Sequence, residues 1–351
     1  MAMRAALLRG TRLIQIQDVP VPSILHPKDA VIKVTLTSIC GTDMHPYRGE
    51  LSDFVHNTIM GHEFTGIVES VGDEVKNIQV GDRVVVSDIV ACGDCWYCQK
   101  DMHYHCKNAS LFGYGEVVGE YFPGGQAEKV RVPYADKLLL KIPENVSDEN
   151  AIFVGDILST GYACAVEGQI KEDDCVVVIG GGPVGLMTIL CSKMFTKSKV
   201  FLIEPNENRH LIAKKLGAIP LKPNELDQIY YFTNQRGADV VLEAVGTDNT
   251  LQAALDLVRP KGNVVCVGAH HSKAMPFNTE RSFAKELSLK FVVGDPLKYG
   301  ELLLEKIKDG KLDPSVIISH RMSFENIETA YEMFESQKAL KIVLSLGELR
   351  V

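Results

Sequence analysis

The sequence predicts an α/β protein with two folded parts, a small irregular β-barrel and a doubly wound parallel sheet. The first 150 or so residues contain short alternating strands separated by prolines and glycine turns, which is typical of a small barrel. From about residue 174, β-branched runs alternate with helix-length stretches at spacings of roughly 20 to 25 residues, the pattern of repeated βαβ units. A length of 351 residues fits two such domains.

In the first part, we expect strands at 5–8, 13–17 and 30–36, separated by prolines at 20, 22 and 27. Two further strands are expected at 64–71 and 82–86, joined through glycine turns at 72–73 and 81–82.

In the second part, we expect strands at 175–179, 199–203, 239–242, 263–267 and 287–293, and helices near 184–195, 207–216, 224–235 and 248–258. After residue 295 the pattern predicts helices over 299–308 and 324–335 and a last strand over 340–346.

The most informative segment is CVVVIGGGPVGL at 175–186, where a strand, a glycine turn and a helix follow one another. Gly180, Gly182 and Gly185 form the pattern G-x-G-x-x-G of dinucleotide-binding βαβ units. The three glycines allow a tight turn, close approach of a pyrophosphate and close packing of the helix on its strand. Pro183 suits the first helical position, and the helix N-terminus offers free N–H groups to phosphates.

An acidic residue supports this interpretation, because Glu204 follows the next strand, nineteen residues after Gly185. A carboxylate there accepts hydrogen bonds from the ribose of NAD and repels the additional phosphate of NADP. Two alternatives are a glycine turn without a ligand and a membrane span, since 175–192 carries no charge and reaches about 18 residues. Four glycines and a proline within that segment argue against the span.

The net charge and the amino-terminal sequence give expectations about binding partners and cellular location. With 37 Lys+Arg against 45 Asp+Glu, the net charge is −8, which gives no electrostatic reason to expect nucleic acid or an anionic membrane as partner. The first residues lack the apolar stretch of a signal peptide, so we expect a cytoplasmic protein.

Four of the nine cysteines, Cys92, Cys95, Cys98 and Cys106, lie close together with a C-x2-C-x2-C-x7-C spacing. Such thiolates can converge on one Zn²⁺ in a closed, structural site. Disulfides would need an oxidising compartment, and an iron–sulfur cluster is a further alternative. His103 or His105 could replace Cys106 in a Cys3His site.

A second possible metal site is dispersed over Cys40, His62, Glu63 and Asp156. Spacing alone makes this a weak signal, because a His-Glu pair is usually a surface or satisfied pair and Cys40 could be a core residue.

Several motifs in order along the chain give it a resemblance to a known family. They are ICGTDMH at 39–45, GHEFTG at 61–66, VGDEV at 71–75, GDRV at 81–84, the 92–106 cysteines, GGQAE at 124–128 and VIGGGPVG at 178–185. The chain resembles the zinc-containing medium-chain dehydrogenases, a group that includes alcohol, polyol and threonine dehydrogenases. The resemblance implies a GroES-like catalytic barrel over 1–157 with a zinc lobe at 90–107, a Rossmann domain over 158–294, and a return to the barrel over 295–351, with the active site in the cleft between the domains.

The resemblance also implies two Zn²⁺ per chain. Cys40, His62 and Asp156 would hold the catalytic ion, with Glu63 beside it as support or as an exchangeable ligand. An aspartate at position 156 is similar to bacterial alcohol and formaldehyde dehydrogenases. Thr42 and His45 match the family's proton relay, although both could be ordinary turn residues.

For the cofactor, the carboxyl ends of two predicted strands lead to Val245, Gly246, Val267 and Gly268, where a dinucleotide would be met. The resemblance adds Thr160 in the nicotinamide pocket, Arg209 over the adenine and Lys341 near the pyrophosphate. Arg209 could equally be a solvated helix charge. Residues expected at NAD are therefore Thr160, Gly180, Gly182, Pro183, Val184, Gly185, Glu204, Arg209, Val245, Gly246, Val267, Gly268 and Lys341.

The sequence thus favours an NAD-dependent zinc alcohol dehydrogenase that acts on a small alcohol or carbonyl compound. A polyol, threonine or formaldehyde dehydrogenase is the alternative within the family, and an NAD-binding sensor with structural zinc alone is the alternative outside enzymes. The resemblance implies a homo-oligomer, a dimer or tetramer, formed through the Rossmann sheet edge and the zinc lobe.

Overall fold

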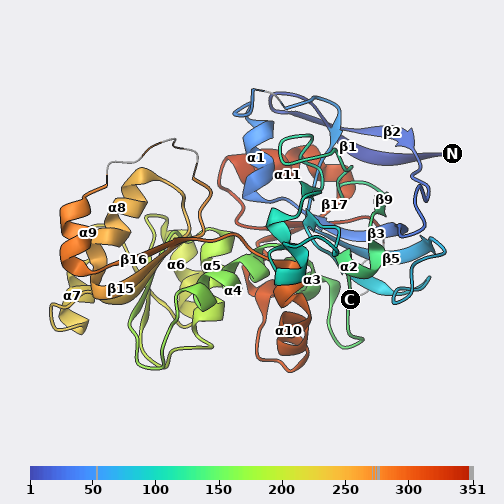
Figure 1. Cartoon of the computed structure of the whole chain (residues 1–351). Coiled ribbons are helices and arrows are strands. Elements are labelled where there is room, and N and C mark those ends of the chain that lie inside the picture. The colour runs from blue at the N-terminus through green and yellow to red at the C-terminus, as the bar shows by residue number, and fades with distance from the viewer. Residues whose placement is uncertain (53, 271, 273, 275–276, 348–351) are drawn as a thin grey trace. The chain divides into compact units, whose positions relative to one another are not determined.

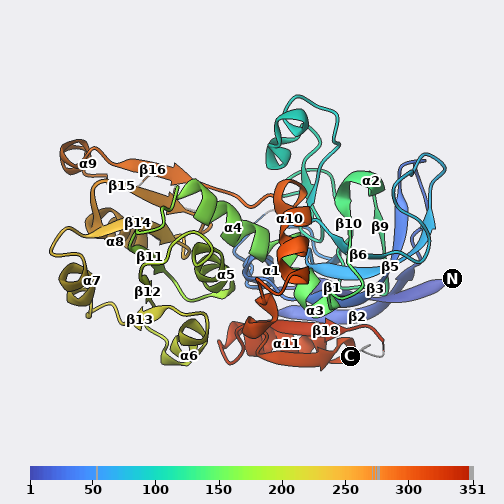
Figure 2. The same ribbon diagram turned by 90° about the horizontal axis from the view of Figure 1, so that it is seen from below.

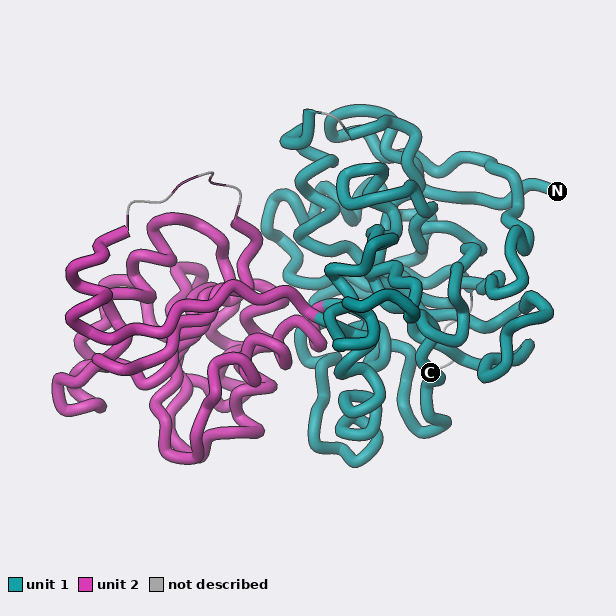
Figure 3. The backbone as a smooth tube through the Cα atoms, viewed as in Figure 1, with its two compact units in different colours: residues 1–156, 295–351 teal, residues 157–294 magenta. Residues whose placement is uncertain are grey.

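A computed structural model describes residues 1–52, 54–270, 272, 274 and 277–347. The chain forms two compact units, one of residues 1–156 with 295–351 and one of residues 157–294 (Figure 3). We call them unit 1 and unit 2. The boundaries expected from the sequence lie within one residue of these.

Unit 1 is built around mainly antiparallel sheets (Figure 1). The larger sheet has the order β10 (Leu139–Lys141), β6 (Arg83–Val86), β5 (Phe64–Val71), β3 (Ala30–Ser38), β18 (Ile342–Ser345) and β17 (His320–Ser323), and β9 (Lys129–Val132) also pairs with β3. Smaller sheets are formed by β2 (Leu13–Pro20), β1 (Ala2–Gly10) and β4 (Thr58–Ile59), and by β7 (Ile89–Val90) and β8 (Ser110–Leu111).

The C-terminal segment belongs to unit 1, as expected from the resemblance. Its strand β18 pairs antiparallel with β3, with Val343 opposite Ser38, and parallel with β17. Helix α10 (Pro296–Lys308) begins the segment and α11 (Ile327–Glu335) precedes β18. Because β18 lies beside β3, the residues before β18 come close to the end of β3, where Cys40 follows.

Unit 2 is a six-stranded parallel sheet with the order β13 (Ile219–Leu221), β12 (Val200–Ile203), β11 (Val176–Ile179), β14 (Ala238–Glu243), β15 (Val258–Cys266) and β16 (Ser288–Phe291). Strand order reverses between β11 and β14, which is the Rossmann arrangement with its ligand crevice at that reversal. β11, β12 and β14 are buried along their whole length, as their β-branched and apolar composition predicts.

Helices cover both faces of this sheet. Figure 2 shows α4 (Ile157–Glu167) and α5 (Pro183–Ser192) on one side and α7 (Asp227–Phe232) and α8 (Asp248–Leu257) on the other. Apolar side chains of β11, β12, α7 and α8 share one core cluster. The remaining helices of the unit are α6 (Glu207–Lys215) and α9 (Thr279–Lys285).

One helix is shorter than expected. The helix expected over 224–235 ends at Phe232, because Asn234 and Gln235 have positive φ angles of 50° and 63° that a helix cannot accommodate. The charge-free stretch 175–192 is divided into β11, the glycine turn and α5. Within the described part of the chain, no helix combines the length and apolarity needed to cross a bilayer.

Candidate functional site

Cys40, His62 and Asp156 converge in unit 1. The Asp156 Oδ2 atom lies 3.5 Å from Cys40 Sγ and 3.3 Å from His62 Nε2. Ligand atoms bound tetrahedrally to one Zn²⁺ at ordinary bond lengths are separated by roughly 3.3–3.6 Å. The three side chains therefore fit a zinc ion with three protein ligands, which leaves one position for a water or a substrate.

Local structure brings these side chains together from separate elements. Cys40 follows β3 and is the N-cap of α1 (Gly41–Tyr47), with its N–H donating to Asp43 Oδ2 at 2.9 Å. His62 lies in the connection between β4 and β5. Asp156 ends the short helix η3 (Ile152–Gly155), whose Gly155 carbonyl accepts a hydrogen bond from the Asp88 N–H at 2.9 Å.

Asp43 has a role that sequence reasoning missed. Its buried Oδ1 lies 3.3 Å from Nδ1 of His62, so it orients the ring with Nε2 toward Cys40 and Asp156. Carboxylates commonly hold metal-ligating histidines in this way. The sequence contains one local signal for Asp43, because a carboxylate three residues after an N-cap commonly bonds back to the N-cap backbone and is fixed there. No local pattern predicts that this carboxylate also faces His62.

The electrostatics of the three side chains favour a cation between them. Burial lowers the pKa of His62, but Asp43 and Asp156 outweigh burial and raise it well above its ordinary value. Burial and the charge of Asp156 raise the pKa of Cys40 to about 11. A divalent cation bound here would displace both protons, which is the usual coupling between metal binding and proton release.

Lys341 lies buried inside unit 1 and not at the expected cofactor site. Its side chain and that of Glu63 are fully buried and form an ion pair. The Lys341 Nζ also donates to the Ile39 carbonyl at 3.1 Å, and Ser38 donates its hydroxyl to the same Glu63 oxygen. This placement corrects the expectation that Lys341 binds a pyrophosphate, because a lysine without exposed surface and bonded inside unit 1 holds Glu63 beside His62 instead.

The two expected relay residues lie on α1. Thr42 Oγ1 is 3.9 Å from Cys40 Sγ, which places the hydroxyl beside the three converging side chains. His45 Nδ1 lies 2.6 Å from Glu50 Oε2, and the Glu50 side chain is about half exposed. The passage of a proton from Thr42 to His45 stays a prediction.

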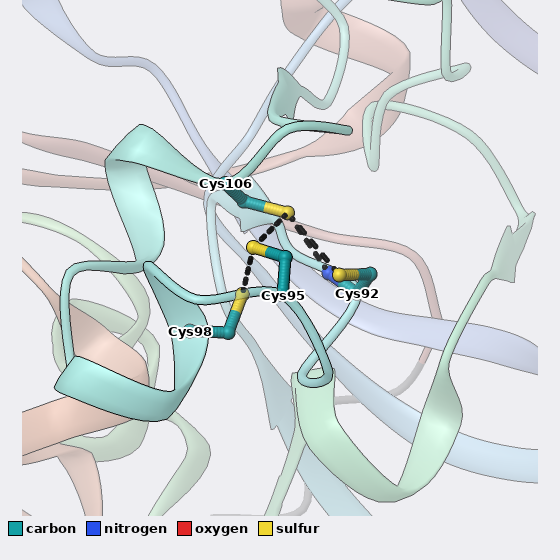
Figure 4. Close-up of side chains that lie close together, drawn as sticks. All are labelled: Cys92, Cys95, Cys98 and Cys106. Atoms are coloured by element: carbon teal, nitrogen blue, oxygen red, sulfur yellow. Dashed lines mark hydrogen bonds between the residues drawn. The ribbon is translucent and has the colours of Figure 1, made fainter.

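A second cluster is formed by Cys92, Cys95, Cys98 and Cys106 in the 90–107 lobe (Figure 4). Sulfur–sulfur distances are 3.6 Å from Cys95 to Cys98, 3.9 Å from Cys95 to Cys106 and 3.5 Å from Cys92 to Cys106. Four thiolates on one tetrahedral Zn²⁺ would be roughly 3.7–3.8 Å apart. The lobe therefore fits a closed, structural zinc site.

Backbone groups around these sulfurs stabilise thiolates. Cys95 has its pKa lowered to about 6, mainly by hydrogen bonds from the N–H groups of Cys98 and Lys107. Cys106 accepts hydrogen bonds from the N–H groups of Cys92 and Asn108, both at 3.3 Å.

Neither histidine of this lobe belongs to the cluster. His103 instead places Nδ1 2.9 Å from the Asp295 carboxylate, and the His105 ring contacts the ring of Tyr97. The cysteine-only set therefore fits this structure better than a Cys3His site.

The glycine turn of unit 2 has the geometry that a dinucleotide requires. Gly180 follows β11 with a φ of 99°, a region that favours glycine. A Cβ on Gly185 would lie 1.9 Å from the Gly180 carbonyl, so the α5 helix packs directly on the turn. Gly182 is the N-cap, Pro183 is the first residue of α5, and a Cβ on Gly182 would meet open space. Phosphates therefore have access to the first N–H groups of α5, those of Val184 and Gly185.

Glu204 lies at this turn, directly after β12. Its carboxylate accepts hydrogen bonds from the Gly181 N–H at 2.7 Å and the Asn206 N–H at 2.8 Å. Arg209 on α6 donates to the same carboxylate at 3.1 Å. An acidic group is therefore fixed at the end of β12, where the ribose of a dinucleotide lies in this fold.

The other residues expected at the cofactor belong to unit 2 as well. Val245 and Gly246 follow β14, and Val267 and Gly268 follow β15, so both pairs lie at the carboxyl edge of the sheet. Thr160 is part of α4. Their contact with a cofactor stays a prediction.

Comparison with known proteins identifies the family of this chain. Residues 26–144 match the alcohol dehydrogenase GroES-like domain and residues 183–308 match the zinc-binding dehydrogenase family. Zinc-type alcohol dehydrogenase B of Aspergillus flavus is 32% identical over 99% of this chain and 82% of its own length. The chain belongs to the zinc-containing medium-chain alcohol dehydrogenase family.

Solved structures of three dehydrogenases have the same fold as this chain. Alcohol dehydrogenase TADH from Thermus sp. ATN1 is 38% identical, with a TM-score of 0.94 over 98% of this chain and 99% of its own. An Escherichia coli alcohol dehydrogenase complexed with NADH is 26% identical, with a TM-score of 0.86 over 98% and 99%. A zinc-binding dehydrogenase of Sinorhizobium meliloti bound to NADP is 25% identical, with a TM-score of 0.87 over the same shares.

Proposed function

We propose that this dehydrogenase interconverts a small alcohol and an aldehyde or ketone, with NAD as the hydride carrier and Zn²⁺ at Cys40, His62 and Asp156. The convergence of these three side chains carries the proposal, because three ligands of mixed charge with tetrahedral spacing are typical of catalytic rather than structural zinc. When bound, Zn²⁺ acts as a Lewis acid that polarises the substrate oxygen, and the nicotinamide carries the hydride.

The residues of unit 1 would orient the substrate and remove its proton. Thr42 has a hydroxyl beside Cys40 that can accept the proton of an alcohol and donate its own onward. His45 is one turn further along α1, and its contact with Glu50 places a carboxylate at Nδ1. With Nδ1 donating to Glu50, Nε2 of His45 is an acceptor for the proton.

The preference for NAD over NADP is proposed from Glu204. Its carboxylate is held by two backbone N–H groups and cannot easily turn away from an additional phosphate at the ribose. Relatives of this fold bind either cofactor, so a selectivity measurement is needed. We expect kcat/KM to favour NAD by at least tenfold and the Glu204→Ala variant to reduce that ratio. Equal use of both cofactors by the unaltered protein would refute this part.

Activity is tested by a substrate screen that follows NADH absorbance. The panel includes primary and secondary alcohols, polyols, threonine and formaldehyde with a thiol, so it separates the alternatives within the family. His62→Ala should lose turnover by at least 10³-fold while circular dichroism still shows a folded protein, and His26→Ala, an exposed histidine, serves as control.

Metal analysis separates the enzyme from an NAD-binding sensor. We expect the two clusters of unit 1 to hold two zinc equivalents per chain, of which one is lost in His62→Ala. One equivalent in the wild type, together with no turnover on the panel, would favour the sensor.

Self-association through the edge of the unit 2 sheet is proposed from its exposed apolar side chains. β16 is the last strand in the order, and Phe291 at its end and Val293 just after it are 62% and 53% exposed. An exposed apolar edge strand is a typical template for pairing with a second copy. Light scattering after size-exclusion chromatography should show a dimer or tetramer that Phe291→Lys weakens, and a monomeric wild type would refute the proposal.

A further inference from the structure

Three potential metal ligands meet in unit 2, apart from both clusters of unit 1. Glu243 ends β14, Cys266 ends β15, and His270 lies four residues further on. Their ligand atoms lie within 4.8 Å of one another. The Glu243 Oε2 atom is 3.3 Å from His270 Nε2, the same oxygen–nitrogen separation as between Asp156 and His62.

The carboxylate of Glu243 is fixed by its neighbours. Oε1 accepts hydrogen bonds from the N–H groups of Val245 at 2.8 Å and Gly246 at 2.9 Å, and from the Thr250 hydroxyl at 2.8 Å. Oε2 is the oxygen that faces His270. A metal-ligating carboxylate needs this kind of support from outer hydrogen bonds.

The other two ligands are also well placed. The His270 ring forms a T-shaped contact with Phe291, with ring centroids 5.5 Å apart. Glu243 and Cys266 are buried at 0% and 1% exposure, whereas the His270 side chain keeps 15% of its surface exposed. A cation could therefore reach the two buried ligands from the side of His270.

We propose that Glu243, Cys266 and His270 form a site for one divalent cation, Zn²⁺ or Cd²⁺, that joins His270 to the ends of β14 and β15. A carboxylate, a thiolate and an imidazole suit such ions, whereas Mg²⁺ and Ca²⁺ prefer oxygen alone. Binding exchanges the Cys266 S–H bond for a sulfur–metal bond, and the released proton passes to solvent. Burial and the charge of Glu243 raise the pKa of Cys266 to about 12, so the thiol carries that proton before the cation binds.

Metal counting on the intact protein tests this site independently of any enzymatic activity. Protein with its native metals is dialysed against Cd²⁺, and the sum of zinc and cadmium per chain is measured, so that exchange at the other sites leaves the count unchanged. Cys266→Ala and His270→Gln remove one ligand each. Cys191→Ala is the matched control, because Cys191 is a fully buried thiol of the same unit outside the cluster.

We expect the wild type and Cys191→Ala to hold one more metal equivalent than Cys266→Ala and His270→Gln. Uptake in the wild type should release about one proton per cation and raise the thermal midpoint, and neither effect should occur in the two ligand variants. Circular dichroism before dialysis verifies that all four proteins are folded. The proposal would be overturned if the four proteins held the same metal total per chain. It would also be overturned if Cys266→Ala or His270→Gln bound the additional metal equivalent as the wild type does. The count does not depend on dinucleotide or substrate, so its failure leaves the proposed function untouched.

Discussion

Replacing Lys341 with methionine would leave the Glu63 carboxylate buried without its cation. Both side chains have no exposed surface, and Lys341 also donates to the Ile39 carbonyl. Removing one partner of a buried ion pair costs about 3–5 kcal/mol, because the remaining charge is desolvated and uncompensated. Since the Ile39 carbonyl loses its donor as well, we expect about 4–5 kcal/mol of lost unfolding free energy.

A surface pair provides the matched control. Lys129 and Glu69 are 2.7 Å apart, but their side chains are 27% and 43% exposed, so Lys129→Met should cost only about 0–1 kcal/mol. The double variant Lys341→Met with Glu63→Gln should be more stable than Lys341→Met alone, because it removes the uncompensated charge.

Urea unfolding of the zinc-loaded protein measures these differences. Far-ultraviolet circular dichroism follows the unfolding transition. If Lys341→Met costs no more than Lys129→Met, or if the double variant is no more stable than the single one, then burial of the pair does not have the energetic effect argued here.

Three further outcomes are expected. Cys95→Ser should lose one zinc equivalent and about 5–10 °C of thermal midpoint, and full zinc content in this variant would contradict the closed cysteine site. Gly185→Ala should abolish NADH binding by fluorescence titration, because its Cβ would lie 1.9 Å from the Gly180 carbonyl, and unchanged affinity would show that the helix can shift. Asp43→Asn should weaken zinc at His62 by about 10–100-fold in a chelator competition, and an unaltered affinity would mean that Asp43 does not orient the ring.

The features that the sequence predicts well are those with a local cause. The glycine turn, Glu204 after the next strand and the cysteine spacing all act over a few residues, and the structure has each of them in the expected element. Short elements such as β7 and β8, with two residues each, have no periodicity to detect. The dispersed ligands of unit 1 were assigned through family resemblance, because no local pattern connects Cys40 with Asp156.

Lys341 shows why the remainder could not be predicted. A lysine is almost never fully buried, and the family resemblance placed Lys341 near a pyrophosphate. Its position depends on the pairing of β18 with β3, in which Val343 lies opposite Ser38, and this brings Lys341 to the Ile39 carbonyl and to Glu63. Pairing between strands some 300 residues apart is a tertiary property that a single sequence does not reveal.

The buried Lys341–Glu63 ion pair balances part of the negative charge around Cys40, His62 and Asp156. Cys40 and Asp156 would contribute negative charge when they hold a metal. The Asp43 carboxylate lies 3.3 Å from His62, and the charge of Glu63 is close enough to raise the pKa of Cys40. One dication would balance two of these four negative groups, and Lys341 balances a third through its contact with Glu63. The fourth group, the Asp43 carboxylate, can accept a hydrogen bond from the Nδ1–H of His62. The other ring nitrogen, Nε2, then faces the position between Cys40 and Asp156. Hydrophobic residues of similar size would be as stable in this buried volume or more so, and the four acidic groups are what the proposed metal at Cys40, His62 and Asp156 would require.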